Sequence, residues 1–141
     1  MSDRILYDYL MRFVGRPYKW GGDDAIKGFD CSGLVIEFLI AASVAPHGYD
    51  ASSSQLVDFV KSKGGERTSL PKFGSLVFYG IPSVNHVAIA LDQHLMIEAG
   101  GGDSTVVDEE SAAKKNAFIK VRPIVYRKGL NQIVHPKFFW E

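Results

Sequence analysis

The chain contains one cysteine, Cys31, and its surroundings favour a reactive thiol. Cys31 follows Asp30 and opens an apolar helical pattern in KGFDCSGLVIEFLIAA, so we expect Asp30 to cap a central helix over about residues 31–43. Unpaired N–H groups and the dipole at a helix N-terminus favour the nucleophilic thiolate. The small neighbours Ser32 and Gly33 leave room for a substrate. Asp30 opposes the thiolate unless its carboxylate caps the helix or binds a substrate amine.

A thiol nucleophile needs a base, and His86 is the best placed of the four histidines. His86 opens the run HVAIAL directly after the loop GIPSVN, and a strand start fed by a loop can project a side chain into a cleft. The other three occur in a turn, at a hairpin tip and in the tail: His47, His94 and His135.

The hairpin formed by HVAIAL and LMIEA supplies a third group, Glu98. A three-residue loop over 92–94 gives one aliphatic face, made of Val87, Ile89, Leu91, Leu95, Ile97 and Ala99. A two-residue loop would place the Glu98 carboxylate in that face, which is costly. In the favoured register Glu98 is a diagonal neighbour of His86, at about 7–8 Å between Cα atoms. Ala88 and Ala90 leave this second face shallow, so we expect the Cys31 helix to lie against it.

Each of these three residues taken alone is more often structural. A single free cysteine is usually a small core residue, a strand-end histidine a satisfied polar group, and a strand glutamate a solvated charge. Their combination, at a helix start and on one face of a sheet, favours a catalytic site.

The order of the expected elements predicts an α+β fold. Amphipathic helices are expected over about residues 3–14 and 53–63, before and after the Cys31 helix, with GRPYKWGGDDAIKG as a loop. After these, GSLVFYG, HVAIAL, LMIEA and FIKVRPIVYR predict short strands. N-terminal helices packed on a C-terminal antiparallel sheet follow from this order. We expect the aromatic tail NQIVHPKFFWE to pack back on the body rather than to bind a partner.

Composition limits the classes of function. The 141 residues suit a single domain, 1–141, and 46% hydrophobic residues suffice for a core. Sixteen basic residues balance 16 acidic ones, which argues against binding to nucleic acid or an anionic membrane. One cysteine forms no internal disulfide and no multi-thiolate metal site. No segment has the roughly 18 apolar residues of a membrane span, and the N-terminus lacks the apolar core of a Sec signal.

Several blocks resemble a known family when taken together. GRPYKWGG, FDCSGLV, ASSSQLVDFV, PKFGSLVFY and HVAIAL…MIEA occur in the order seen in NlpC-type cell-wall cysteine peptidases, which are papain-like enzymes that cleave peptides of bacterial peptidoglycan. The resemblance runs from about Gly15 to Ala99 and implies a papain-like fold. It implies Cys31 as nucleophile and His86 as base, with Glu98 at the orienting position, where many relatives carry histidine.

The resemblance also implies substrate contacts near the thiol. Tyr18 matches a tyrosine that borders the site and assists the oxyanion, and Trp20 lies in the same block. Asp30 and Ser32 match residues that hold the substrate's amine in some relatives. The sequence departs from the family at Ser75, where relatives usually have aspartate, and at the hairpin tip LDQHL, which lacks the usual glycine.

The resemblance implies a monomeric cysteine endopeptidase that cleaves stem peptides, for example at γ-D-glutamyl-diaminopimelate, through a thioester and without a metal or organic cofactor. We expect it to be made in the cytoplasm and to reach the cell wall as a phage lysin, as a phage-delivered tail hydrolase or by another export route. The alternatives are an N-acetylmuramoyl-L-alanine amidase or acyltransferase on the same fold, and a non-catalytic phage structural or binding module with a relict triad.

Overall fold

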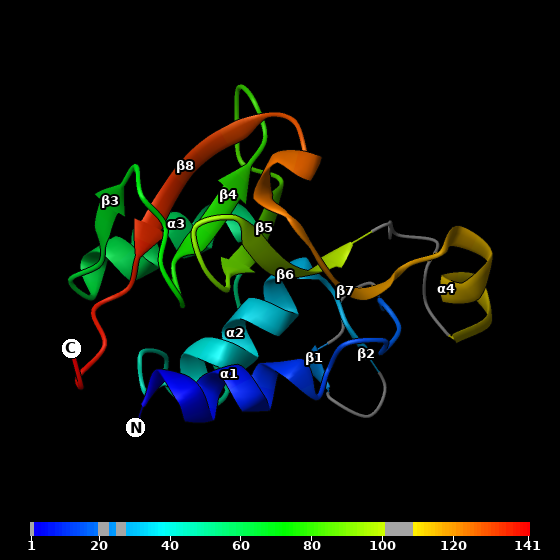
Figure 1. Cartoon of the computed structure of the whole chain (residues 1–141), viewed down its shortest axis with the longest axis horizontal. Helices are drawn as coiled ribbons and strands as arrows, with labels where there is room; N and C mark the ends of the chain where they lie inside the picture. The colour runs from blue at the N-terminus through cyan, green and yellow to red at the C-terminus, as the bar shows by residue number, and fades with distance from the viewer. Residues whose placement is uncertain (1, 20–22, 25–27, 101–108) are drawn as a thin grey trace.

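The computed structural model describes residues 2–19, 23–24, 28–100 and 109–141. Three helices come first, and a six-stranded sheet follows (Figure 1). The helical part comprises α1 (Asp3–Met11), the short hairpin β1 (Asp23–Asp24) and β2 (Gly28–Phe29), α2 (Cys31–Ala41) and α3 (Ser53–Ser62). The sheet part comprises β3 (Glu66–Thr68), β4 (Leu76–Tyr79), β5 (His86–Ala90), β6 (Leu95–Gly100), α4 (Glu109–Lys115), β7 (Phe118–Pro123), the 3₁₀ helix η1 (Ile124–Tyr126) and β8 (Leu130–His135).

Side-chain caps fix the starts of the three N-terminal helices. The Ser2 side chain accepts a hydrogen bond from the first turn of α1, and the Asp30 carboxylate does the same for α2. Ser52 and Gln55 form a reciprocal capping box at α3. Such caps satisfy N–H groups that the helix itself cannot pair. The three predicted helices are therefore confirmed, and Cys31 is the first helical residue of α2.

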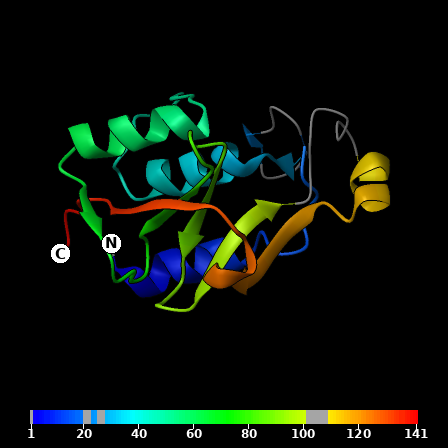
Figure 2. The same cartoon turned by 90° about the horizontal axis from the view of Figure 1, so that it is seen from above.

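All neighbouring strands of the large sheet are antiparallel, in the order β3-β8-β4-β5-β6-β7. This confirms the predicted α+β class. The sheet includes two strands that the sequence did not indicate, β3 at one edge and β8 beside it. The tail segment NQIVH contributes most of β8, which pairs with both β3 and β4. Helix α4 was also not predicted, and Figures 1 and 2 place it at one end of the molecule beside β7.

Helix α2 packs on the aliphatic face of the sheet, which corrects one prediction. Its buried residues Leu34, Val35 and Phe38 belong to the main core together with Val87 and Ile89 of β5. The expected packing of α2 on the Ala88 side is wrong. The larger aliphatic side chains offer the helix more apolar area to bury, and burial of area drives the packing. Figure 1 shows α1 and α2 side by side beneath the sheet.

The opposite face of the sheet carries a second, smaller core. Ala88 and Ala90 are buried there beneath Tyr79, Met96 and Ile124. The Tyr79 hydroxyl donates a hydrogen bond of 2.8 Å to the backbone oxygen of Ile124, which holds η1 over this face. The shallow surface is thus filled by large side chains from the neighbouring strands and from η1.

The aromatic tail packs on the body, as predicted. Phe138 is buried in the main core, where its ring contacts Phe38 and stacks on Trp140. The Trp140 indole N–H donates to Asp3, which ties the tail to α1. Figure 2 shows both termini at the same end of the molecule. Within the described ranges, no helix is long and apolar enough to cross a bilayer.

Candidate active site

The thiol of Cys31 lies where the start of α2 meets the start of β5. Backbone N–H groups of Ser32 and Val87 form hydrogen bonds to the sulfur. Because Val87 follows His86 directly, this contact brings the thiol to the strand end that carries the imidazole. The Cys31 side chain is neither fully buried nor fully exposed.

Burial raises the pKa of the Cys31 thiol to about 11, and the Asp30 carboxylate acts in the same direction. The N–H groups of Val87 and Ser32 and the charge of Arg127 lower the pKa but do not outweigh burial. A group with such a pKa is protonated at neutral pH. The thiol therefore needs a base at the moment it attacks a substrate.

His86 and Glu98 form a buried pair at the strand end whose Val87 N–H contacts the sulfur. His86 Nε2 lies 2.7 Å from Glu98 Oε1, and Glu98 has no exposed surface. The β5–β6 register opposes Ile89 to Ile97 and Ala90 to Met96, so residues 92–94 form the predicted odd loop. The diagonal relation of His86 to Glu98 follows from this register and is confirmed.

The protonation of the pair leaves one imidazole nitrogen able to take a proton. Burial lowers the pKa of His86, an effect that the bond to Glu98 opposes, so the imidazole is neutral near pH 7. Burial alone would raise the pKa of Glu98. His86 and Arg127 outweigh burial and hold the pKa of this carboxyl below its usual value, so it stays ionised. A neutral imidazole that donates from Nε2 to a carboxylate has its lone pair on Nδ1.

Two arginines that the sequence reading did not include surround Glu98. Arg127 donates from Nε to Glu98 Oε1 at 3.2 Å, and Arg122 Nη1 lies 3.6 Å from Oε2. Arg122 opposes Met96 in the β6–β7 register and so shares the face of Glu98. The alternation of side chains along the two strands was a usable signal for this contact, because a buried carboxylate requires a positive partner on its own face of the sheet. Arg127 follows η1. The expected strand FIKVRPIVYR ends at Pro123 instead of continuing to Arg127, so that part of the prediction is wrong and strand alternation could not place Arg127.

Asp30 and Ser32 are arranged as a helix cap. Asp30 Oδ1 accepts from the Gly33 N–H at 2.6 Å and from the Ser32 hydroxyl at 3.3 Å. The capping interpretation of Asp30 is therefore confirmed, and the cap holds the carboxylate close enough to the thiol to raise its pKa.

Tyr18 and Trp20 were expected to border the thiol. Tyr18 is buried in the main core, and its N–H donates to the Ala117 carbonyl at 2.9 Å. This bond, with a bridge between Pro17 and Phe118, fixes the start of the GRPYKWGG block against β7. Trp20 lies outside the described residues.

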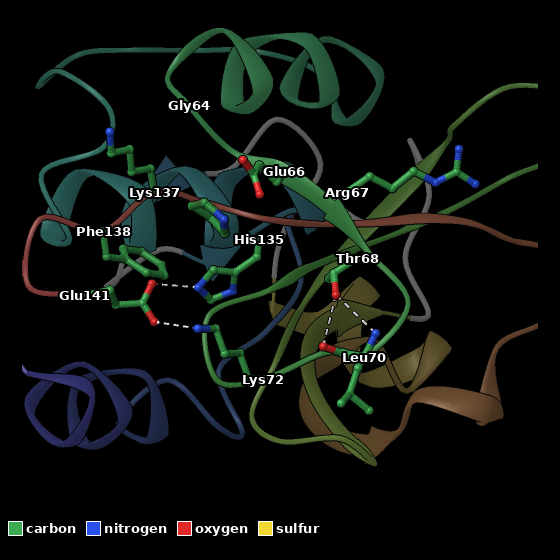
Figure 3. Close-up of a pocket in the computed structure, with 11 residues that line it drawn as sticks. Gly64, Glu66, Arg67, Thr68, Leu70, Lys72, His135, Lys137, Phe138 and Glu141 are labelled. Carbon is green, nitrogen blue, oxygen red and sulfur yellow. Dashed lines mark hydrogen bonds and ion pairs between the residues drawn. The ribbon is translucent and has the colours of Figure 1, made fainter.

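A pocket of about 640 Å³ lies at the other end of the sheet, beside the tail. Figure 3 shows Lys72, His135 and Glu141 pointing toward one another there, with the Glu141 carboxylate bonded to both Lys72 and His135. His135 ends β8 next to Glu66, whereas His86 lies beside Tyr79 at the opposite end of β4. This pocket is separate from the Cys31 site. In the described parts of the chain, no three His, Cys, Asp or Glu side chains are grouped to hold a metal ion.

Comparisons with solved structures show the same fold. The NlpC/p60 domain of the peptidoglycan hydrolase SagA matches with a TM-score of 0.67 at 24% identity, covering 95% of this chain and 98% of that one. RipD from Mycobacterium tuberculosis, described as a non-catalytic NlpC/p60 protein adapted to peptidoglycan binding, matches with a TM-score of 0.65 at 22% identity, covering 94% and 95%.

Two curated relatives are similar in sequence over about 100 residues. Murein DD-endopeptidase MepH of Escherichia coli (strain K12) is 28% identical over 101 residues, which cover 70% of this chain and 36% of MepH. Peptidoglycan endopeptidase RipA of Mycobacterium tuberculosis is 32% identical over 101 residues, covering 63% of this chain and 20% of RipA. The chain thus matches only a minor part of each relative. The NlpC/P60 family model matches residues 15–122, and the chain belongs to the NlpC/P60 family.

Proposed function

We propose that the chain is a cysteine endopeptidase of peptidoglycan, with Cys31 as nucleophile, His86 as general base and Glu98 as the orienting group. The observation that carries this proposal is the buried hydrogen bond of 2.7 Å between His86 and Glu98 at the start of β5. The next residue of this strand, Val87, contacts the Cys31 sulfur through its backbone N–H. A nucleophile, a base and an orienting carboxylate are the minimal set for acyl transfer through a thioester.

The proposed cycle begins with a protonated thiol. As the sulfur attacks the scissile carbonyl carbon, the S–H proton passes to His86 Nδ1, and Glu98 stabilises the imidazolium through Nε2. The imidazolium then protonates the leaving amine, and the C–N bond breaks to leave a thioester on Cys31. His86 next removes a proton from water, which attacks the thioester and releases the carboxylic acid and the thiol.

The oxyanion and the substrate are held by groups around the start of α2. We assign the oxyanion to the Cys31 backbone N–H and the Tyr18 hydroxyl, each contributing roughly 3 kcal/mol. Asp30 and Ser32 are proposed to face the substrate's amine, as the resemblance to the family implies, from the start of α2 beside Cys31. Trp20 is proposed to line the same cleft.

The proposed substrate bond is γ-D-glutamyl-diaminopimelate in a stem peptide. Support comes from the family and from relatives described as peptidoglycan endopeptidases. An amidase or acyltransferase on this fold would use the same three residues on a different bond. Purified walls provide the first test: the wild-type protein is expected to clear them, and Cys31→Ala is expected to lose clearing while keeping the fold. Equal clearing by both proteins would end the catalytic proposal.

A second candidate is a non-catalytic peptidoglycan-binding module. The specific observation in its favour is the structural likeness to RipD, described as non-catalytic. Co-sedimentation with insoluble walls separates the two candidates. A binding module would sediment with walls and release no fragment, and its binding would be unchanged in Cys31→Ala. An endopeptidase would release fragments with time, and only its inactive variant would remain on intact walls.

A further inference from the structure

We propose that Arg127 is a positioning residue that keeps the His86–Glu98 pair in its working protonation state; this inference rests on the function proposed above. The guanidinium grips both carboxylate oxygens of Glu98, with Nε 3.2 Å from Oε1 and Nη2 3.5 Å from Oε2. Oε1 is also the oxygen bonded to His86 Nε2. Arg127 therefore sets the plane of the carboxylate that orients the imidazole.

The need for such a group follows from burial. Glu98 has no solvent contact, and an ionised carboxylate without compensation in such a place tends to take up a proton. A protonated Glu98 would no longer accept the imidazole N–H as an anion, and the preferred tautomer of His86 would be lost. Arg127 opposes both changes because its positive charge favours the ionised carboxylate and disfavours a charged imidazole.

The fold is built to present Arg127 at this point. The segment after β7 is fixed on one side by the bond from the Tyr79 hydroxyl to the Ile124 carbonyl and on the other by the 2.8 Å bond from the Gly80 N–H to the Gly129 carbonyl. The guanidinium also lies 5.9 Å from the centre of the Tyr79 ring. Both anchors come from the end of β4, the strand next to His86.

Gly100 leaves the space that the ion pair occupies. A Cβ at this position would lie 2.9 Å from Glu98 Oε2 and 3.2 Å from Arg127 Nη2. Arg127 itself lies beyond residue 122, where the match to the family model ends. The positioning device is therefore carried by a part of the chain outside the segment that defines the family.

The charged and titratable groups that face His86 come from every neighbouring element. They are Tyr79 of β4, Glu98 of β6, Arg122 of β7 and Arg127 after η1. Lys120 of β7 opposes Glu98 in the β6–β7 register and interacts with its charge, and the Cys31 thiol interacts with the charge of Arg127. Only Arg127 combines a two-point hydrogen-bonded contact to Glu98 with a position off the sheet.

The test compares Arg127→Gln with Lys128→Gln. Both remove one positive charge from the same segment, but Lys128 is exposed and contacts no charged partner in the described structure. We expect Arg127→Gln to lower kcat on a defined wall peptide by at most roughly tenfold, the cost of losing the Glu98 carboxylate on which it acts, with little change in KM. Lys128→Gln should retain wild-type kcat, and Arg127→Lys should fall between the two. Equal rates for Arg127→Gln and Lys128→Gln would overturn the proposal.

The pH profile separates positioning from a general loss of structure. Removing Arg127 should raise the pKa of His86, so the acid limb of kcat/KM should move to higher pH; Lys128→Gln should not move it. In a Glu98→Gln background, the further change Arg127→Gln should cost little, because the charge on which Arg127 acts is gone. Full additivity of the two losses would contradict action through Glu98.

A measurement that needs no activity keeps this inference distinct from the proposed function. Titration of the His86 ring by ¹⁵N NMR in the folded variants should show a higher pKa in Arg127→Gln than in the wild type and Lys128→Gln. If the wild-type protein cleaves no wall peptide and this shift is present, the catalytic proposal fails and the Arg127–His86 coupling holds. If cleavage is present and the shift is absent, the role of Arg127 is wrong.

Discussion

At the scale of single residues, the site is organised by one buried charge. Glu98 accepts hydrogen bonds from His86 and Arg127, and Arg122 lies close by. The charges of these four side chains, from three strands and a loop, therefore influence one another. The arginines compensate the burial of the Glu98 carboxylate at this position. Cys31 is coupled to these charges only through Arg127, and burial keeps its thiol protonated at neutral pH.

We expect His86→Ala to be far more damaging than Glu98→Gln. Loss of the base removes proton transfer in both half-reactions, an effect of about 10²- to 10⁴-fold on kcat. Glu98→Gln keeps a hydrogen-bond acceptor for the imidazole and should cost roughly tenfold, since orienting groups contribute less than the base. Steady-state kinetics on a defined wall peptide would check the ranking. Equal losses in two folded variants would mean that Glu98 has a role beyond orientation.

Alkylation of Cys31 should follow its raised pKa. With a pKa of about 11, the thiolate fraction rises tenfold per pH unit across the neutral and mildly alkaline range. The rate of iodoacetamide labelling, followed by intact-mass spectrometry, should therefore increase from pH 6 to pH 10 without levelling. A plateau near pH 7 would instead indicate a resting thiolate–imidazolium pair and contradict this account of the site.

The residue scale was also where the sequence was most informative. The position of Cys31, the capping by Asp30 and the His86–Glu98 contact all follow from local rules: capping chemistry and the two-residue period of strands. The arginines were missed for different reasons. The contact of Arg122 with Glu98 depends on how β7 pairs with β6, and this register could not be predicted across the intervening α4. The contact of Arg127 depends on the path of the chain through and after η1, which no repeating pattern in the sequence indicates.

At the scale of elements, the tail is part of the fold. Its strand β8 lies inside the sheet between β3 and β4, and Phe138 fills the space above Gly74. Ser75 Oγ lies 2.8 Å from His135 Nδ1, which links the start of β4 to the end of β8. Ser75 thus helps to hold the tail strand against β4.

Phe138→Ala should destabilise the protein by about 3–5 kcal/mol, because it removes a fully buried ring from the main core. Phe139→Ala is the matched control, since Phe139 is 66% exposed and should change stability by no more than about 0.5 kcal/mol. Urea unfolding of both variants gives the comparison. Similar losses would show that the tail is not part of the core.

The elements that the sequence did not reveal lack periodic apolar patterns. Strand β3 reads ERT and is exposed at an edge, and α4 reads EESAAKK with one apolar pair. The packing face of α2 was also misjudged. Strand alternation defines two faces but not which of them meets the helix, and here the choice depended on Tyr79 and Met96 filling the Ala88 side.

At the scale of the whole molecule, the chain joins two regions with different roles. One end of β4 and β8 carries the tail, the His135–Glu141 contact and the pocket of Figure 3. The other end carries His86 and the segment that presents Arg127. The aliphatic core between α2 and the sheet connects the two and holds the thiol against the strand end.

Global stability should decrease toward acid pH in two stages. The folded protein holds His86 neutral and keeps Glu98 and Glu141 ionised, so all three pKa values lie below those of the unfolded chain. Their stabilisation is complete above pH 6.5. It declines below this value through His86, then below pH 4.5 through the two carboxylates. Calorimetric Tm values should be level from pH 8 to about pH 6.5 and should fall from there to pH 4; a Tm that rises between pH 7 and pH 5 would contradict the neutral, buried state of His86.

The most direct test of the central claim is digestion of defined muropeptides from walls of several chemistries, with mass spectrometry of the products. The account predicts that the wild-type protein cleaves a single type of stem-peptide bond, and that folded Cys31→Ala and His86→Ala leave every muropeptide intact. The same products from Cys31→Ala, or no cleaved bond with folded wild-type protein, would contradict it.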